Sequence, residues 1–229
     1  MNIKTFQSID ACATALADDL AEVLANVLEQ RAGASLALSG GRSPQKVLPR
    51  LAAKPLRWSD VAVTLSDERC VPFTDKNSNA AMVRTNFLEQ GAEQASFYPL
   101  WTEGLDLETG LKAAADELQN IVWPLDVIYL GMGDDGHFAS LFPSDDMATF
   151  DADNSPVVAG HASSSPFQRI SLSLSTILKA RHLFLHVTGA AKCAVFENAR
   201  TITPTPECPI SLLVQNDEID LRVYMADGN

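Results

Sequence analysis

Apolar residues recur at helical spacing near the start of the chain. They fall on one face of a helix between residues 10 and 31, at Cys12, Leu16, Leu20, Val23, Leu24, Val27 and Leu28. This spacing predicts an amphipathic helix. We expect further helices over residues 43–53, 79–90, 107–121 and 190–199.

Short runs of β-branched and large apolar residues alternate with these helices. They predict strands at 36–38, 61–65, 126–130, 169–174 and 181–187, and segments 210–214 and 221–225 complete the set of elements. Strands that alternate with helices indicate βαβ units. The predicted fold class is therefore α/β, with a doubly wound, mostly parallel, Rossmann-like sheet flanked by helices. The irregular stretch 142–166 is too short to mark a boundary, so we expect one domain over residues 1–229.

The charge of the chain changes which partners fit it. With 46% hydrophobic residues the chain can form a full core, and its formal net charge is -12. Such a surface repels nucleic acids and anionic membranes, so we expect neither as a partner. It also repels an anionic metabolite on average. A phosphate site would therefore need a local cluster of cations and backbone amides.

The sequence shows no pattern typical of a targeting segment, a membrane span or a cysteine-based site. Asp10, Asp18 and Asp19 interrupt any signal-peptide core, and no apolar stretch is long enough to span a bilayer. We expect a cytoplasmic protein, either a monomer or a homodimer. Four widely spaced cysteines suggest reduced thiols, with neither a zinc site nor a disulfide framework, and we expect no metal and no cofactor.

Four polar, glycine-containing segments share one position relative to the strands. Segments 39–43, 66–69, 131–137 and 188–189 each follow the carboxyl end of a predicted strand. In an open parallel sheet, ligands bind at that edge. We therefore expect the four segments to converge on one site.

The first segment has the features of a phosphate-binding turn. Gly40 and Gly41 leave backbone amides accessible, Arg42 offers a cation, and Ser43 is a good N-cap before Pro44 at the first helical position. A helix start of this kind favours a bound anion. A tight β–α turn that needs glycine explains the same residues equally well.

The next two segments carry candidates for proton transfer. Asp67 could handle protons and Arg69 could bind an oxyanion, although a solvated turn with a local ion pair also fits. In the turn 131–137, Asp135 and His137 follow a strand end among three glycines. A lone histidine is usually structural, but this context favours a catalytic His137 with Asp135 fixing its tautomer.

Two cations complete the candidate site. Arg169 opens a predicted strand, and Lys192 lies in the first turn of a helix, where the positive dipole end disfavours it. A bound phosphate between helix and ammonium would explain this placement. An exposed surface lysine is the alternative. We interpret the other three histidines, His161, His182 and His186, as structural.

Taken together, these motifs resemble a known family. SGGRSP (39–44), SDERCVP (66–72) followed by SN (78–79), LGMGDDGHFASLFP (130–143), RISLSL (169–174) and TGAAK (188–192) are similar, in order and spacing, to 6-phosphogluconolactonases. Asp134 and Phe138 depart from the proline and threonine that the family often has. The chain is more distantly similar to glucosamine-6-phosphate deaminases. Those enzymes have a catalytic glutamate after the D-G-H turn, where this chain has 139–143 (ASLFP).

The resemblance implies hydrolysis of 6-phospho-D-glucono-1,5-lactone to 6-phosphogluconate. It places the phosphate on Gly40, Gly41, Arg42 and Ser43, with Arg169 and Lys192 neutralising its charge. His137 would activate water, Asp135 or Asp67 would orient His137 or the water, and Arg69 or a backbone amide would stabilise the oxyanion. A deaminase-like isomerase and a non-catalytic sugar-phosphate sensor are the alternatives.

Overall fold

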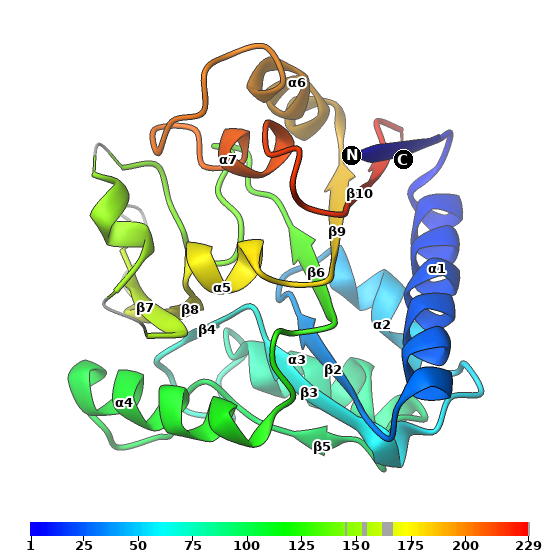
Figure 1. The fold of residues 1–229 in the computed structure, drawn as a ribbon, viewed down its shortest axis with the longest axis vertical. Helices are drawn as coiled ribbons and strands as arrows, with labels where there is room; N and C mark the ends of the chain where they lie inside the picture. Colours follow the sequence, from blue (N-terminus) through cyan, green and yellow to red (C-terminus); the bar gives the residue numbers. More distant parts are fainter. Residues whose placement is uncertain (145, 153–154, 162–166, 229) are drawn as a thin grey trace.

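The computed structural model describes residues 1–144, 146–152, 155–161 and 167–228 (Figure 1). A seven-stranded sheet lies at its centre, in the order β1-β10-β9-β6-β2-β3-β5. All neighbouring strands in this order are parallel. This confirms the predicted α/β fold. The strands are β1 (Asn2–Phe6), β2 (Ala34–Leu38), β3 (Val61–Leu65), β5 (Ser96–Phe97), β6 (Val127–Gly131), β9 (His182–Thr188) and β10 (Leu221–Ala226).

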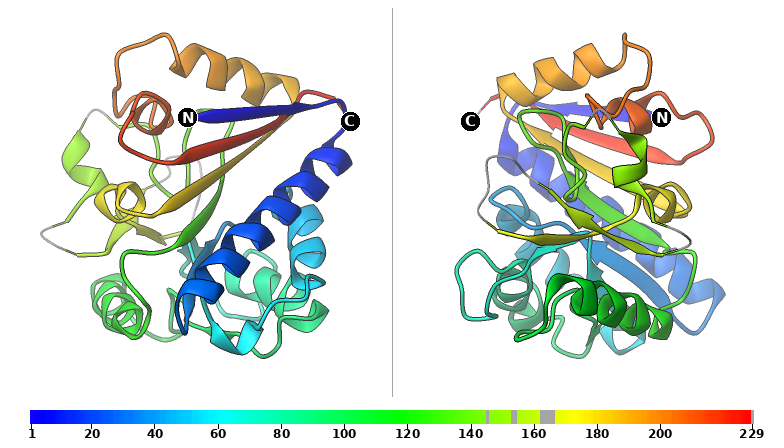
Figure 2. Two further views of the ribbon diagram at one scale, coloured as in Figure 1. Left: turned by 45° about the vertical axis from the view of Figure 1, so that its right-hand side comes forward. Right: turned by 90° about the vertical axis from the view of Figure 1, so that its left-hand side faces the viewer.

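Helices cover both sides of this sheet. α1 runs along one side and contacts β1, β2, β6, β9 and β10, while α5 and a small second sheet lie on the other side (Figure 2). The α-helices are α1 (Ile9–Gln30), α2 (Pro44–Ala52), α3 (Asn79–Asn86), α4 (Leu107–Glu117), α5 (Leu174–Leu178), α6 (Ala190–Ala199) and α7 (Ser211–Val214). Short 3-10 turns form η1 (Trp58–Asp60), η2 (Leu88–Gln90), η3 (Leu118–Asn120) and η4 (Met147–Phe150).

The second sheet is the main departure from the predicted elements. It is antiparallel, in the order β4 (Asp67–Arg69), β8 (Arg169–Leu172) and β7 (Val157–Gly160). Segment 67–69 is thus a short strand rather than a loop. The strand predicted over 169–174 ends at Leu172, because the Ser173 side chain caps α5 by accepting a hydrogen bond from Thr176 N. β1, β5 and β7 are not predicted from the sequence pattern, and segment 210–214, expected to complete the set of strands, forms the helix α7 (Ser211–Val214).

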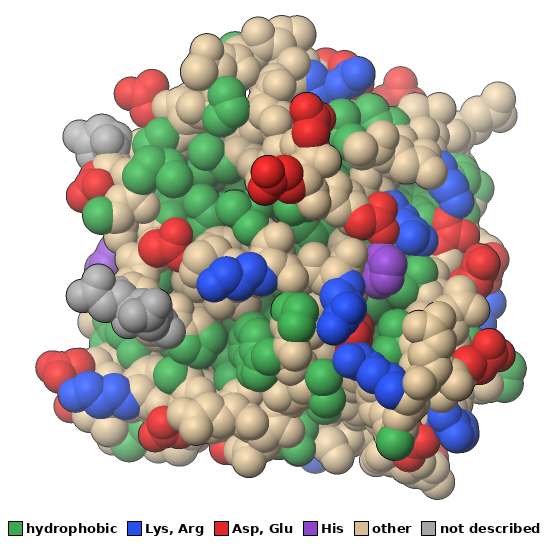
Figure 3. Space-filling view, viewed as in Figure 1, with side chains coloured by type: hydrophobic (Ala, Val, Ile, Leu, Met, Phe, Trp, Pro, Cys, Tyr) green, Lys and Arg blue, Asp and Glu red, His purple; other side chains and the backbone are tan. Residues whose placement is uncertain are grey.

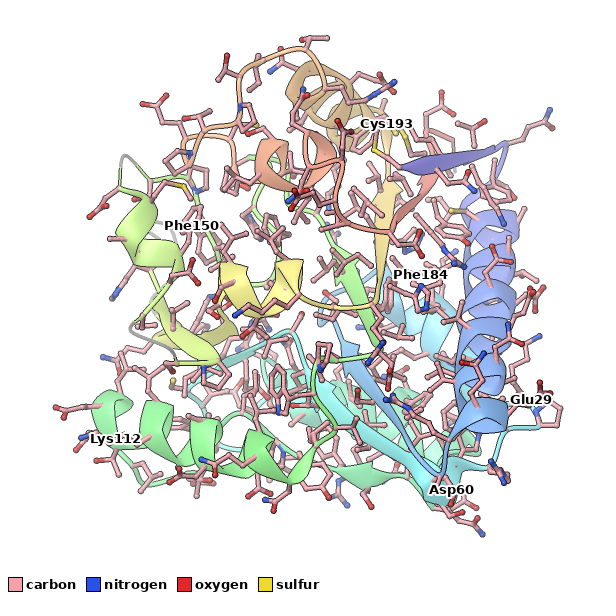
Figure 4. All side chains as sticks on the ribbon, viewed as in Figure 1. Glu29, Asp60, Lys112, Phe150, Phe184 and Cys193 are labelled. Atoms are coloured by element: carbon pink, nitrogen blue, oxygen red, sulfur yellow. The ribbon has the colours of Figure 1, made fainter. Side chains whose placement is uncertain are left out.

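The core lies between the central sheet and its helices. Every residue of β2 is buried, and α1 buries the apolar stripe that its sequence predicts. Phe184 of β9 lies inside the molecule and stacks on Tyr224 of β10, with ring centroids 5.9 Å apart, whereas Glu29 and Lys112 point outward (Figure 4). Each such buried side chain stabilises the fold by roughly 1.5–3 kcal/mol relative to exposure.

The strand order creates a crevice at one edge of the sheet. From β2 the chain proceeds outward to β3 on one side, and it later returns to place β6 on the other side of β2. The loops that follow β2 and β6 therefore leave neighbouring strands in different directions. Ligands bind at such a switch point in open α/β sheets.

Candidate active site

The loop after β2 requires glycine at two positions, each for a different physical reason. Gly41 has φ of +101°, a backbone conformation that residues with side chains rarely adopt. A Cβ on Gly40 would lie 1.9 Å from Oδ1 of Asn79, so only glycine fits there without displacing that amide. Ser43 occupies the N-cap position of α2, but its side chain makes no cap hydrogen bond. Its hydroxyl instead contacts the Thr188 hydroxyl at 3.0 Å, which ties this loop to the end of β9.

Asp67 is held by three neighbours from different segments. Its Oδ2 accepts a hydrogen bond from the Ser140 hydroxyl at 2.6 Å and lies 3.6 Å from Nη1 of Arg169. The Asn79 amide donates to Asp67 Oδ1 at 3.2 Å and to its backbone carbonyl at 2.8 Å. The Asp67 side chain is only 7% exposed. A carboxylate fixed in this way orients the Arg169 guanidinium.

Glu68, beside Asp67, fixes the start of α3. Its carboxylate accepts hydrogen bonds from the backbone N–H groups of Arg69, Asn79 and Ala80, each at 2.7 Å. It is 2% exposed, and burial raises the pKa of its carboxyl while these N–H groups oppose part of that shift. Segment 66–69 is therefore not a solvated turn. Glu68 positions Asn79, which in turn holds Asp67.

His137 and Asp135 form a pair in the tight turn after β6. Nδ1 of His137 lies 2.5 Å from Oδ1 of Asp135, and this hydrogen bond, opposed by partial burial, holds the pKa of Asp135 below its usual value. Gly133 N donates to the His137 carbonyl at 2.8 Å, which closes the turn. The Phe142 ring packs on the imidazole with centroids 4.4 Å apart. Asp135 on one edge and Phe142 against the ring restrain the imidazole.

These segments line a common cavity of about 400 Å³. Nine of the ten residues singled out from the sequence line it, and the tenth, Asp135, contacts His137 from behind. The nine are Gly40, Gly41, Arg42, Ser43, Asp67, Arg69, His137, Arg169 and Lys192. Segments 39–43, 66–69 and 131–137 thus meet at the sheet edge as predicted, whereas 188–189 does not line the cavity and is tied to it only by the contact of Thr188 with Ser43. Asn79 and His186 also line the cavity and are not among the predicted residues.

The cavity is locally positive on an acidic protein. Arg42, Arg69, Arg169 and Lys192 line it, against the carboxylates Asp67 and Asp134. Arg69 and Arg169 occupy directly opposed positions on β4 and β8. Like charges at opposed positions destabilise a sheet unless a counter-charge lies between them. Within the described ranges, neither Arg42 nor Lys192 forms an ion pair with a carboxylate. The arrangement suits an anionic ligand.

A larger cavity elsewhere on the molecule is lined by fewer charged side chains. It has a volume of about 930 Å³ and is lined by residues that include Trp123, Pro124 and Thr176, with Asp151 and Lys179 as its charged side chains. The surface over α5 in Figure 3 shows apolar side chains interrupted by single charges. Because catalysis needs converging polar groups rather than volume alone, the smaller cavity is the candidate active site.

His186 occupies a special position under this cavity. It lies on β9 opposite Gly131 of β6, is 2% exposed, and its Nδ1 lies 3.0 Å from the Tyr129 hydroxyl. Burial, and then the nearby Lys192 charge, lower its pKa from 6.5 to about 4. The sequence pattern RHLFLHV suggests a plain core position, and the cavity-lining role is visible only in the structure.

The lowered pKa of His186 predicts how stability varies with pH. Between its unfolded value of 6.5 and its folded value of about 4, the unfolded chain binds a proton that the folded protein excludes. His186 therefore leaves the free energy of unfolding unchanged above pH 6.5. As the pH falls from 6.5 to about 4, it lowers the free energy of unfolding by roughly 3 kcal/mol in total. We expect His186→Gln to remove this part of the slope. Urea unfolding of both proteins between about pH 7 and about pH 4.5 measures it, and parallel stability curves would contradict the assignment.

The chain that builds this site matches a known protein family. The model of the family described as glucosamine-6-phosphate isomerases/6-phosphogluconolactonase matches residues 7–222. The chain belongs to this family. A 6-phosphogluconolactonase of Mesorhizobium japonicum is 37% identical over 98% of this chain and 95% of its own length. One from Neisseria meningitidis is 35% identical over 97% of each chain.

Solved structures of the family share the fold over nearly the whole chain. A 6-phosphogluconolactonase from Shewanella baltica superposes with a TM-score of 0.92 at 33% identity, covering 99% of this chain and 97% of its own. A monomeric glucosamine-6-phosphate deaminase superposes with a TM-score of 0.81 at 17% identity, covering 99% and 97%. The second likeness concerns the fold alone.

The described part of the chain holds neither a membrane-spanning helix nor a metal-ligand cluster. No helix there is both long and apolar enough to cross a bilayer. No group of three or more His, Cys, Asp or Glu side chains in those ranges is arranged to hold a metal ion.

Proposed function

We propose that this protein hydrolyses 6-phospho-D-glucono-1,5-lactone to 6-phosphogluconate, the lactonase step of the oxidative pentose phosphate pathway. The observation that carries the proposal is one cavity lined by four cations and by His137, which Asp135 contacts from behind. The pair suits activation of water, and the cations suit a phosphate. Relatives at 35–37% identity that are named 6-phosphogluconolactonase support the same substrate.

The phosphate end of the substrate would bind between the Gly40–Ser43 loop and Lys192. The first turn of α2 offers backbone N–H groups and a positive dipole end, and Arg42, Arg169 and Lys192 add charge. The repulsion between Arg69 and Arg169 across the small sheet would be relieved by a bound dianion. Binding energy at this remote end holds the lactone carbonyl beside His137.

The chemical step is addition of water to the ester carbon. His137 Nε2 takes a proton from water, whose oxygen bonds to C1 and forms a tetrahedral oxyanion. The bond from C1 to the ring oxygen then breaks, and His137 returns the proton to that oxygen. Arg69, which donates to the Asn77 carbonyl at 2.6 Å and lines the cavity, can stabilise the oxyanion, as can a backbone amide.

Asp135 rather than Asp67 is the proposed partner of His137. The 2.5 Å contact from Asp135 to Nδ1 leaves Nε2 free to accept the proton from water. Asp67 is instead engaged by Ser140, Asn79 and Arg169. Its proposed role is to orient Arg169 toward the substrate.

A deaminase-like isomerase remains the enzymatic alternative, because that class shares the fold. Residues 139–143 read ASLFP and carry no carboxylate where the resemblance puts the deaminase glutamate. A non-catalytic sensor of sugar phosphates would have no use for the His137–Asp135 pair. The remaining expectations, a single domain that acts in the cytoplasm as a monomer or homodimer without nucleic-acid or membrane partners, belong to the same proposal.

The proposal is tested by proton release from freshly generated 6-phosphogluconolactone, measured above its spontaneous opening. We expect kcat/KM for this substrate to exceed that for unphosphorylated glucono-1,5-lactone by about 10²-fold or more, because charge-assisted phosphate contacts contribute about 1.5–3 kcal/mol each. Glucosamine 6-phosphate serves as the competing substrate. Hydrolysis no faster than background, or ammonia release from the amino sugar, would refute the proposal.

A further inference from the structure

His186 is buried beneath the part of the cavity that holds the loop after β2. Thr188, two residues later on the same face of β9, contacts Ser43 of that loop. Lys192, in the first turn of α6, lines the same cavity and is close enough to depress the imidazole's proton affinity. His186 thus lies near groups proposed to bind phosphate.

The contact with Tyr129 fixes which ring nitrogen carries the hydrogen. The Tyr129 side chain is fully buried, and in the described part of the chain its hydroxyl contacts no hydrogen-bonding group other than His186 Nδ1. A buried hydroxyl that failed to donate would cost about 1–3 kcal/mol. Tyr129 therefore donates to Nδ1, and a neutral imidazole then carries its hydrogen on Nε2.

This leaves a buried donor without an acceptor. His186 Nε2 is buried and has no hydrogen-bond partner among the described residues, although His186 is one of the residues that line the cavity. Most buried polar groups are paired, so an orphan N–H beside a positive cavity indicates a missing acceptor. The cationic lining makes an anion the fitting acceptor, and a phosphate offers oxygens in several directions.

We propose that His186 is a neutral hydrogen-bond donor of the phosphate subsite, anchored by Tyr129 and acting on a phosphate oxygen directly or through one ordered water. The identity of the phosphate as the 6-phosphate of a sugar lactone rests on the proposed function. Because the donor is uncharged, it adds directional selectivity for the phosphate end. The lactone end does not require it.

The first test measures the tautomer and its response to an anion. Nitrogen-detected NMR of the intact protein labelled in histidine reports which ring nitrogen is protonated. We expect Nε2–H in the free protein and a shift of that proton on addition of inorganic phosphate, then of 6-phosphogluconate, but not of gluconate. A hydrogen on Nδ1, or no response to either phosphate, would overturn the inference.

The second test uses variants that keep the buried pair satisfied. The double variant Tyr129→Phe/His186→Phe removes the donor without leaving a hydroxyl unpaired, and His186→Gln keeps an amide donor near the position of Nε2. We expect the double variant to raise the Kd of 6-phosphogluconate and the KM of the lactone about 10-fold with a smaller change in kcat, and His186→Gln to recover most of the affinity. Gluconate binding should not change in either.

These outcomes separate the inference from the proposed function. Binding by calorimetry needs no turnover, so an active lactonase whose phosphate affinity is unchanged in the double variant refutes the role of His186 alone. A protein without lactonase activity that still shifts its Nε2–H with phosphate refutes the proposed function alone. Thermal unfolding of each variant identifies loss of the fold, and His186→Gln keeps the test valid should the double variant unfold.

Discussion

Replacing His137 with glutamine should lower kcat for lactone hydrolysis by about 10³-fold, within the range usual for a general base, and leave the Kd of 6-phosphogluconate nearly unchanged. Glutamine fills much of the space of the imidazole beside Asp135, which lies 2.5 Å from Nδ1 in the native pair, but it cannot take a proton from water at neutral pH. Because the phosphate groups are untouched, binding energy at that end is retained. Single-turnover hydrolysis and calorimetry with 6-phosphogluconate measure the two quantities.

The chain offers a matched control for this variant. His182 also pairs with an aspartate, with Nδ1 2.7 Å from Oδ2 of Asp220, and it does not line the cavity. His182→Gln should therefore leave kcat at the wild-type level. If His137→Gln retained full activity, or if both variants lost activity equally, the assignment of His137 as the base would be wrong.

The parts of the site that the sequence predicts are those that follow from parallel-sheet geometry. Segments 39–43 and 131–137 follow the carboxyl ends of two neighbouring strands, β2 and β6. Their convergence can therefore be predicted without knowing how the side chains pack. Helix boundaries follow from apolar spacing and capping residues such as Ser78 and Asp106, whose side chains cap α3 and α4. Local chemistry is enough for both kinds of prediction.

What the sequence does not predict depends on contacts between distant segments. The small sheet needs β4 to pair with β8, about a hundred residues later in the chain, and a three-residue strand gives almost no periodic signal. Asn79 joins the site only because Glu68 holds the start of α3 beside Asp67. His186 sits in an apolar run, and its one usable signal is its spacing from Thr188, since residues two apart on a strand share a face.

The identity of the carboxylate that partners His137 is likewise only partly predictable from the sequence. Sequence places both carboxylates at the sheet edge, and either could partner His137. The i, i+2 spacing in a glycine turn brings Asp135 to the ring, while Asp67 is drawn to Ser140, which follows His137 by three residues. The turn that makes this pairing possible depends on Gly133.

Gly133→Ala should reduce kcat by about 10²- to 10³-fold while the protein stays folded, because a displacement of about 1 Å at a catalytic group costs on the order of 10²-fold. A Cβ at this position would lie 2.2 Å from both Nδ1 and Cε1 of His137 and 2.7 Å from Oδ1 of Asp135. The φ of Gly133 is not positive, so alanine meets no backbone strain and the effect is steric. The turn backbone is held by hydrogen bonds from Gly133 N and Gly136 N, so the imidazole moves instead.

Two comparisons decide whether the methyl group acts through His137. Gly131→Ala, two residues earlier, places a Cβ 3.4 Å from the Ser39 hydroxyl and should keep nearly the wild-type kcat. In the double variant Gly133→Ala/His137→Gln, the alanine should add almost no further loss, because groups that act as a unit are strongly non-additive. Independent losses that multiply would show that Gly133 serves the fold of the turn. If the double variant loses no more activity than His137→Gln alone, Gly133 acts through the position of the imidazole. The lack of a side chain at residue 133 then serves to leave room for the ring that accepts the proton.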